Sequence, residues 1–248
     1  YFRGRVAPLA SKYRLIIPDL PGFGLSPKPR VDYDPVFFRD SVRSFLTAEG
    51  LAGRPCVLVG HSLGSIVAVE YAAEWPEEVI GLALFNLPRY SSAEEAHLLF
   101  YAGSPNYRKL LGEDSLAENI AQLRRTGLDL FFRYAMSFPF AVYADCRKFT
   151  LRSLTSTLLN SLIHYSVDGA LDRLKPVPAL LVHGVRDTVA PLDNVRPVAK
   201  RFPWMRLEVI EGSGHHVLLT HSRRCLDLIG PLLEEAFGPG PPKGARGR

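Results

Sequence analysis

The chain alternates short apolar runs with segments of helical periodicity. Runs of continuous apolar character suit strands that are buried on both faces of a sheet. Four runs are of this kind: Tyr13–Leu20, Pro55–Gly60, Val79–Asn86 and Pro178–Gly184. A fifth, Met205–Gly212, alternates apolar and polar positions, which predicts a strand near an edge of the sheet.

Between these runs, Pro35–Leu51 and Ser62–Pro76 carry apolar residues at helical spacing. Pro76 ends the second helix, because proline cannot continue one. Strands that alternate with helices predict an α/β fold, with a mostly parallel sheet and helices on both of its faces.

The stretch from Pro88 to about Tyr165 interrupts this alternation. It is rich in aromatic residues and shows helix-like patches but no clear strand over about 75 residues, which is far longer than an ordinary connection. We therefore expect a helical cap at 88–165, inserted between two parts of one core at 1–87 and 166–237. Residues 238–248, rich in proline and glycine, are expected to be disordered.

Composition narrows the classes of protein. A chain of 248 residues, 47% of them hydrophobic, can bury a full core as one domain with an insertion. The net charge is +5, but Lys243, Arg246 and Arg248 contribute +3 of it, so the rest carries about +2 and nucleic-acid binding is not indicated. No apolar run reaches the roughly 18 residues of a membrane-spanning helix. The three cysteines lack the spacing of a metal or redox site.

Residues 60–64, GHSLG, match the pattern G-x-S-x-G between a predicted strand and a predicted helix. In that context the serine occupies a sharp turn, and small residues two positions before and after it let the strand and helix pass closely. Ser62 would then be exposed above the sheet as a nucleophile. The Leu63 N–H and the helix dipole would face a developing oxyanion. The alternative is that Ser62 only caps the helix.

Candidates for the partners of Ser62 follow the last two predicted strands. Asp187 and His215 lie in the loops at the carboxyl ends of these strands, where open α/β sheets place catalytic groups. A carboxylate there could accept the imidazole Nδ1–H and leave Nε2 to take the serine proton. His216 competes with His215 as the base, and Asp193 competes with Asp187, although Asp193 suits the start of a helix.

The chain resembles the α/β-hydrolase superfamily, in its serine esterase- and lipase-like branch with a helical cap. The resemblance covers Tyr1–Phe237 and rests on four motifs in the family's order: DLPGFGLSPKP at 19–29, GHSLGS at 60–65, HGVRDTVAP at 183–191 and GSGHH at 212–216. It implies Ser62 as nucleophile, Asp187 as acid and His215 as base, because the family places this histidine directly after a glycine. A serine at this position argues against the haloalkane dehalogenase and epoxide hydrolase branches, which use a carboxylate.

The resemblance also bears on residues around the triad. His61 suits packing or the pocket wall better than proton transfer, and we take it, with Phe23 and Leu63, as a candidate to contact substrate. The DLPGFG segment resembles a tight turn that shapes the site, since its glycines permit unusual backbone angles. His183 and Gly184 imitate the family's oxyanion His-Gly pair, but their place at the end of a late strand makes this a coincidence.

One part of the family pattern is missing from the sequence. Family members begin with two or three further strands, and the loop after the third donates a second oxyanion N–H. Residues 1–12 instead resemble the helix that follows that loop. We therefore expect an N-terminally incomplete, weakly active hydrolase with Leu63 as its one identifiable oxyanion donor. The alternative is a chain that rebuilds its sheet in another way.

The resemblance implies hydrolysis of small-molecule carboxylic esters, with small to medium apolar acyl or aryl groups, through an acyl-enzyme. No metal or organic cofactor is implied, because the triad and the backbone account for each proton and charge that moves. The alternatives are a C–C bond hydrolase or a cofactor-free perhydrolase of the same fold, a hydrolase-like binding protein with low turnover, and a structural subunit.

Overall fold

The computed structural model describes residues 2–103 and 148–238. In this part of the chain, four strands form one parallel sheet in the order β1-β2-β3-β4. The strands are β1 (Cys56–His61), β2 (Val79–Phe85), β3 (Ala179–Gly184) and β4 (Met205–Ile210). Each of them corresponds to an apolar run in the sequence, and β4 lies at an edge as its alternation predicted. The expected α/β architecture with a parallel sheet is confirmed.

The register of the strands brings their carboxyl ends to one edge of the sheet. His61 at the end of β1 pairs with Phe85 at the end of β2, and Gly184 pairs with Ile210 at the ends of β3 and β4. The loops that leave these ends therefore emerge side by side, which is where parallel sheets place their functional groups.

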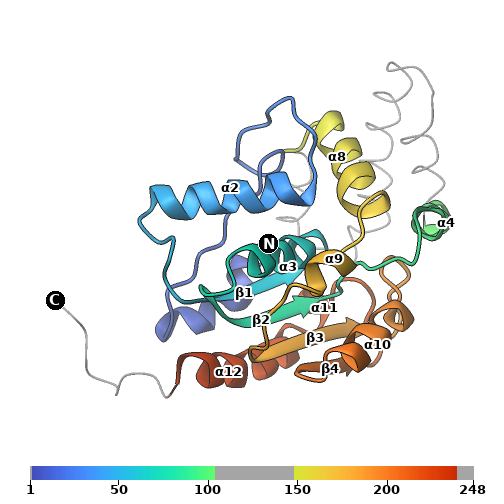
Figure 1. The fold of residues 1–248 in the computed structure, drawn as a ribbon. Helices are drawn as coiled ribbons and strands as arrows, with labels where there is room; N and C mark the ends of the chain where they lie inside the picture. Colours follow the sequence, from blue (N-terminus) through green and yellow to red (C-terminus); the bar gives the residue numbers. More distant parts are fainter. Residues whose placement is uncertain (1, 104–147, 239–248) are drawn as a thin grey trace.

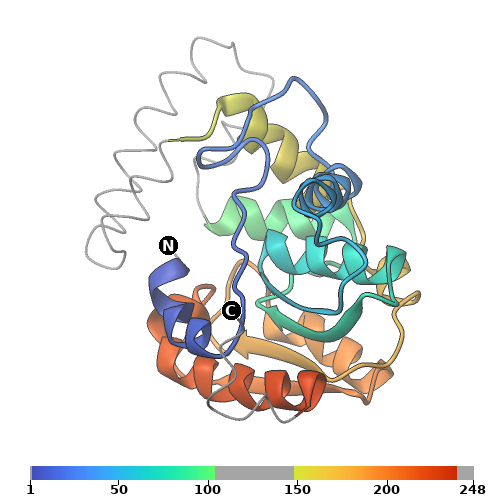
Figure 2. The ribbon, with the colours of Figure 1, turned by 90° about the vertical axis from the view of Figure 1, so that its left-hand side faces the viewer.

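Helices cover both faces of the sheet (Figures 1 and 2). Two apolar clusters, one on each face, join the helices to the strands. One cluster includes α3 (Leu63–Glu74), α9 (Asp168–Leu171) and α10 (Leu192–Arg201). The other includes the 3₁₀ helix η1 (Ala7–Ser11), which follows α1 (Arg3–Val6), together with α11 (Val217–Thr220) and α12 (Ser222–Phe237).

The helix α3 is the most enclosed element that carries a candidate site residue. Eight consecutive residues, from Ser65 to Ala72, are buried, as expected for a helix that is apolar on all sides. It lies between the sheet and α2 (Pro35–Ala48). The carboxylate of Asp34 caps α2 by accepting a hydrogen bond from the N–H of Phe37 at 2.7 Å.

The predicted strand at Tyr13–Leu20 is wrong, because this segment has no regular secondary structure. An apolar run becomes a strand only where a neighbouring strand accepts and donates its backbone hydrogen bonds, and among the described residues β1 pairs with β2 alone. Ile16 and Ile17 are 40% and 47% exposed, and Val59 in β1 is 46% exposed. The run Pro55–Gly60, expected to be buried on both faces, therefore forms an edge strand.

The segments that flank residues 104–147 are helical. They are α4 (Ala93–Gly103), α8 (Leu151–Thr157) and the π-helix η2 (Leu158–Ile163), and Ala96 of α4 belongs to the same apolar cluster as Leu158 and Leu162 of η2. The middle of the expected cap, and the tail from residue 239 on, lie outside the described residues. Within residues 2–103 and 148–238, no helix is both long and apolar enough to span a bilayer.

Candidate active site

Ser62 occupies a strained turn between β1 and α3. Its φ of 53° and ψ of −122° lie in a region that residues other than glycine rarely adopt. The spacing of the glycines is explained in part: a Cβ on Gly60 would lie 2.3 Å from the carbonyl oxygen of Gly64, whereas a Cβ on Gly64 would meet no described atom within 4 Å. The expected need for a small residue therefore holds for Gly60 but not for Gly64.

The helix-cap alternative for Ser62 does not fit this geometry. Ser62 stands at the N-cap position of α3, yet its side chain makes no capping hydrogen bond. Its Oγ lies 2.9 Å from Nε2 of His215. The next residue, Leu63, opens α3, where the first backbone N–H groups have no partner within the helix. Leu63 is the residue that the sequence suggested as an oxyanion donor.

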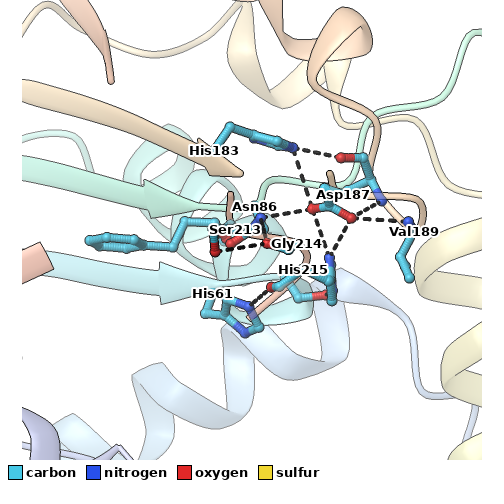
Figure 3. Close-up of polar contacts among 12 residues, drawn as sticks. His61, Asn86, His183, Asp187, Val189, Ser213, Gly214 and His215 are labelled. Carbon is cyan, nitrogen blue, oxygen red and sulfur yellow. Dashed lines mark hydrogen bonds and ion pairs between the residues drawn. The ribbon is translucent and has the colours of Figure 1, made fainter. Parts of the chain in front are cut away.

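Asp187 and His215, the acid and base that the sequence suggested, are in direct contact. Nδ1 of His215 lies 2.9 Å from Oδ2 and 3.1 Å from Oδ1 of Asp187 (Figure 3). The carboxylate is fully buried, and its Oδ1 also accepts hydrogen bonds from the backbone N–H groups of Val189 at 3.0 Å and Ala190 at 2.9 Å. Burial raises the pKa of Asp187, but the hydrogen bonds that it accepts, that of His215 first, outweigh burial and hold the pKa below its ordinary value.

The two competing residues lie outside this hydrogen-bonded chain. Asp193 stands in the first turn of α10, where it accepts a hydrogen bond from Arg196 at 3.1 Å, and its side chain is 90% exposed. The ring of His216 packs near that of His215, with centroids 5.2 Å apart. Burial first, and then the charge of His215, lowers the pKa of His216 to about 4. The contacts to Ser62 and Asp187 are made by His215.

His61 connects the nucleophile's strand to the loop of the candidate base. Its Nε2 lies 2.6 Å from the backbone oxygen of His215 (Figure 3), and because a carbonyl oxygen only accepts, Nε2 carries the hydrogen. Burial and the two neighbouring imidazoles lower the pKa of His61 to about 3, so its ring is neutral near pH 7. The sequence suggested a pocket residue and did not indicate this contact.

His183 lies beside the carboxylate of Asp187, with its Nε2 3.6 Å from Oδ2 (Figure 3), and Phe23 lies in an aromatic cluster. His183 is buried, and its Nε2 lies 2.6 Å from the backbone oxygen of Ala190, which agrees with the expectation that its resemblance to an oxyanion motif is a coincidence. Phe23 packs against Phe38 in a cluster that also includes Leu63. The turn that carries Phe23 has positive φ at Gly22 and Gly24, as its glycines suggested.

Sequence reasoning missed Asn86. This residue follows β2 directly and is fully buried, and its Nδ2 lies 2.7 Å from Oδ2 of Asp187 (Figure 3). The available signal was positional: Asn86 leaves the carboxyl end of a strand, at the same edge of the sheet as the loops of Asp187 and His215. Among the described residues, no group of three or more His, Cys, Asp or Glu side chains is arranged to hold a metal ion.

Comparison with known proteins identifies the class to which this fold belongs. Residues 1–228 match the alpha/beta hydrolase family, and the chain belongs to that family. Lipase 1 of Psychrobacter immobilis is 30% identical over 226 residues, which cover 85% of this chain and 66% of the lipase.

Two further matches cover more of their proteins. A pimeloyl-[acyl-carrier protein] methyl ester esterase of Aeromonas hydrophila is 25% identical over 240 residues, covering 92% of this chain and 88% of the esterase. The crystal structure of E-2-(acetamidomethylene)succinate hydrolase matches with a TM-score of 0.74 at 20% identity, covering 94% of this chain and 86% of that one. Distant relatives and fold neighbours include lipases, esterases, epoxide hydrolases and a meta-cleavage product hydrolase.

Proposed function

We propose that this protein is a serine hydrolase that cleaves carboxylic esters through an acyl-enzyme. One observation carries the proposal: an unbroken chain of hydrogen-bond contacts links Ser62 Oγ to His215 Nε2 at 2.9 Å and His215 Nδ1 to Asp187 Oδ2 at 2.9 Å. This is the geometry in which a histidine can take the serine proton while a carboxylate holds its ring.

Each residue has one role in the proposed reaction. Ser62 Oγ attacks the acyl carbon as its proton passes to Nε2 of His215, and the buried Asp187 stabilises the imidazolium that forms. The N–H of Leu63, aided by the dipole of α3, stabilises the oxyanion. His215 then protonates the leaving alcohol. In the second half, His215 takes a proton from water as the water oxygen attacks the acyl carbon. It then gives this proton to Oγ of Ser62 as the bond between the acyl carbon and Oγ breaks, which releases the acid.

Carboxylic esters are the substrate class that the relatives favour. The printed names of the matched curated proteins include lipases and a methyl ester esterase. The preference for small to medium apolar acyl or aryl groups rests on the aromatic composition of residues 88–165. The same triad also suits a C–C bond hydrolase or a cofactor-free perhydrolase, and a meta-cleavage product hydrolase is among the proteins of similar fold.

Hydrolysis of a short-chain p-nitrophenyl ester tests the proposal. We expect Ser62→Ala to lower kcat by on the order of 10⁴-fold or more, and His215→Gln to have a comparable effect, while the matched variant His216→Gln keeps most of the activity. A fluorophosphonate should label the wild type at Ser62 and should not label Ser62→Ala.

The alternatives predict different results. Equal turnover by the wild type and Ser62→Ala would refute the proposed nucleophile. Labelling at Ser62 without ester turnover would identify a low-turnover binding protein. Faster turnover of a vinylogous diketone than of esters, or peroxide-dependent oxidation in the presence of acetate, would assign the C–C hydrolase or the perhydrolase reaction.

A further inference from the structure

Asn86 has a backbone conformation and an environment that call for explanation. It is fully buried, and its φ of 49° lies in the left-handed region, which asparagine tolerates better than most residues. Its backbone N–H donates to the carbonyl oxygen of Val182 in β3 at 2.9 Å. The residue is therefore fixed at the end of β2 by the sheet itself.

The amide of Asn86 faces two oxygen acceptors. Nδ2 lies 2.7 Å from Oδ2 of Asp187 and 3.3 Å from the backbone oxygen of Gly214 (Figure 3). The opposite orientation would point the amide oxygen at a carboxylate and a carbonyl, which repel it. Oδ1 of Asn86 has no hydrogen-bond partner among the described residues, so the two hydrogens of Nδ2 hold the side chain in place.

One acceptor belongs to Asp187, and the other belongs to Gly214, the residue before His215. Oδ2 is the carboxylate oxygen closest to Nδ1 of His215, at 2.9 Å. The other oxygen of Asp187, Oδ1, accepts hydrogen bonds from two backbone N–H groups of the loop that carries Asp187. The amide of Asn86 therefore contacts both the loop after β3, which carries the acid, and the loop after β4, which carries the base. The same loops are also joined by a backbone hydrogen bond from the N–H of Arg186 to the carbonyl oxygen of Ser213 at 2.8 Å.

We propose that Asn86 is a positioning residue that sets the relative orientation of Asp187 and His215. This inference rests on the proposed function, because the orientation matters only if these groups act on Ser62. An amide suits the position because it donates two hydrogen bonds without charge. An aspartate would have the same shape but would place a second carboxylate beside Asp187, and two carboxylates that close together cannot both ionise readily.

Two substitutions at position 86 test this role. Asn86→Gly keeps the left-handed backbone free of strain and removes the amide, whereas Asn86→Asp keeps the shape and replaces the neutral amide by a carboxyl group that competes with Asp187 for one negative charge. For both variants we expect kcat to fall about 10- to 100-fold, the range for loss of a hydrogen bond to a charged group, with KM within about twofold of the wild type. If Asn86 only fills space, Asn86→Gly should lower the free energy of unfolding but keep the wild-type kcat.

The matched control is Asn194→Asp. The amide of Asn194 also donates to a carboxylate, Oε1 of Glu95, at 2.8 Å, but it does so between α10 and α4 and not at Asp187. This variant should lose stability without loss of kcat. An effect of Asn194→Asp on kcat as large as that of Asn86→Asp would overturn the inference, because both effects would then arise from general destabilisation.

A second readout does not require turnover. The Nδ1–H of His215 should give a proton NMR signal that is protected from solvent in the wild type and in Asn194→Asp, and that is broadened or lost in both variants at position 86. A retained signal in Asn86→Gly and Asn86→Asp, with wild-type kcat where turnover is measured, would overturn the inference. Failure of the proposed function looks different: Ser62→Ala would then match the wild type, while the NMR signal would still report on Asn86.

Discussion

Gly184, the last residue of β3, allows a sharp test of how the loop of His215 is held. A Cβ at this position would lie 2.5 Å from the backbone oxygens of both Ser213 and Gly214, and 3.4 Å is the lower end of ordinary contact. In Gly184→Ala, the end of β3 and the loop that contains Ser213 and Gly214 must therefore separate by about 0.9 Å, the difference between 2.5 Å and 3.4 Å. Backbone atoms cannot rotate away as a flexible side chain would. The displacement of Gly214 therefore reaches His215, which is the next residue in the sequence.

The expected result follows from this displacement. A misplacement of about 1 Å of a catalytic group lowers the rate by about 10²-fold, so we expect kcat of Gly184→Ala on a p-nitrophenyl ester to fall by about two orders of magnitude. Overpacking should also lower the free energy of unfolding by about 1–3 kcal/mol. The backbone of Gly184 does not have a positive φ, so the effect is one of space and not of backbone strain.

Gly230→Ala is the matched control. Gly230 lies within α12, and a Cβ there would meet no described atom within 4 Å. The substitution should leave kcat unchanged and stabilise the helix by up to about 1 kcal/mol. The reasoning would be refuted if Gly184→Ala kept kcat within about threefold of the wild type while it was fully folded by circular dichroism.

Three further outcomes are expected. Asp187→Asn should lower kcat by about 10⁴-fold, because the imidazole of His215 would be held in the wrong tautomer; a loss below tenfold would contradict the role given to the carboxylate. Folding lowers the pKa of His61 from 6.5 to about 3. Between these pH values the unfolded chain binds a proton at His61 that the folded chain does not bind. This group therefore lowers the free energy of unfolding by up to about 1.4 kcal/mol for each unit by which the pH falls. Urea unfolding of His61→Phe should therefore depend less steeply on pH between 6 and 4 than that of the wild type, and equal slopes would contradict the buried neutral ring. Tyr165 donates a hydrogen bond to the buried carboxylate of Glu70, so Tyr165→Phe should lower the free energy of unfolding by about 1–2 kcal/mol in the same assay, without a change in kcat.

Local patterns in the sequence were sufficient to predict most of the sheet. The strands β1 to β4, the helices α2 and α3, and the end of α3 before Pro76 follow from apolar runs, helical spacing and proline chemistry. The failure at Tyr13–Leu20 has a physical reason. Hydrophobicity is a property of the segment itself, but a strand also depends on what lies beside it, and no described strand pairs with this segment.

In the candidate site, too, local motifs predicted some residues, while contacts between distant segments were missed. Ser62, Asp187 and His215 could be proposed because each stands at the end of a predicted strand within a short motif. The contacts of Asn86 and His61 could not be proposed, since they join a side chain to a carboxylate or a carbonyl on a different loop. Such contacts depend on the register of the sheet, which no single segment encodes.

The distances along the chain between the site residues have a consequence for refolding. Asp187 and His215 are 28 positions apart, whereas Ser62 and His215 are 153 positions apart. The acid and base can therefore meet through the short connection between β3 and β4, but the serine joins them only after a long loop has closed, which is the slow kind of contact in folding. After dilution from denaturant, esterase activity should appear with the last kinetic phase, later than helical circular dichroism, and would report that the two halves of the sheet have joined.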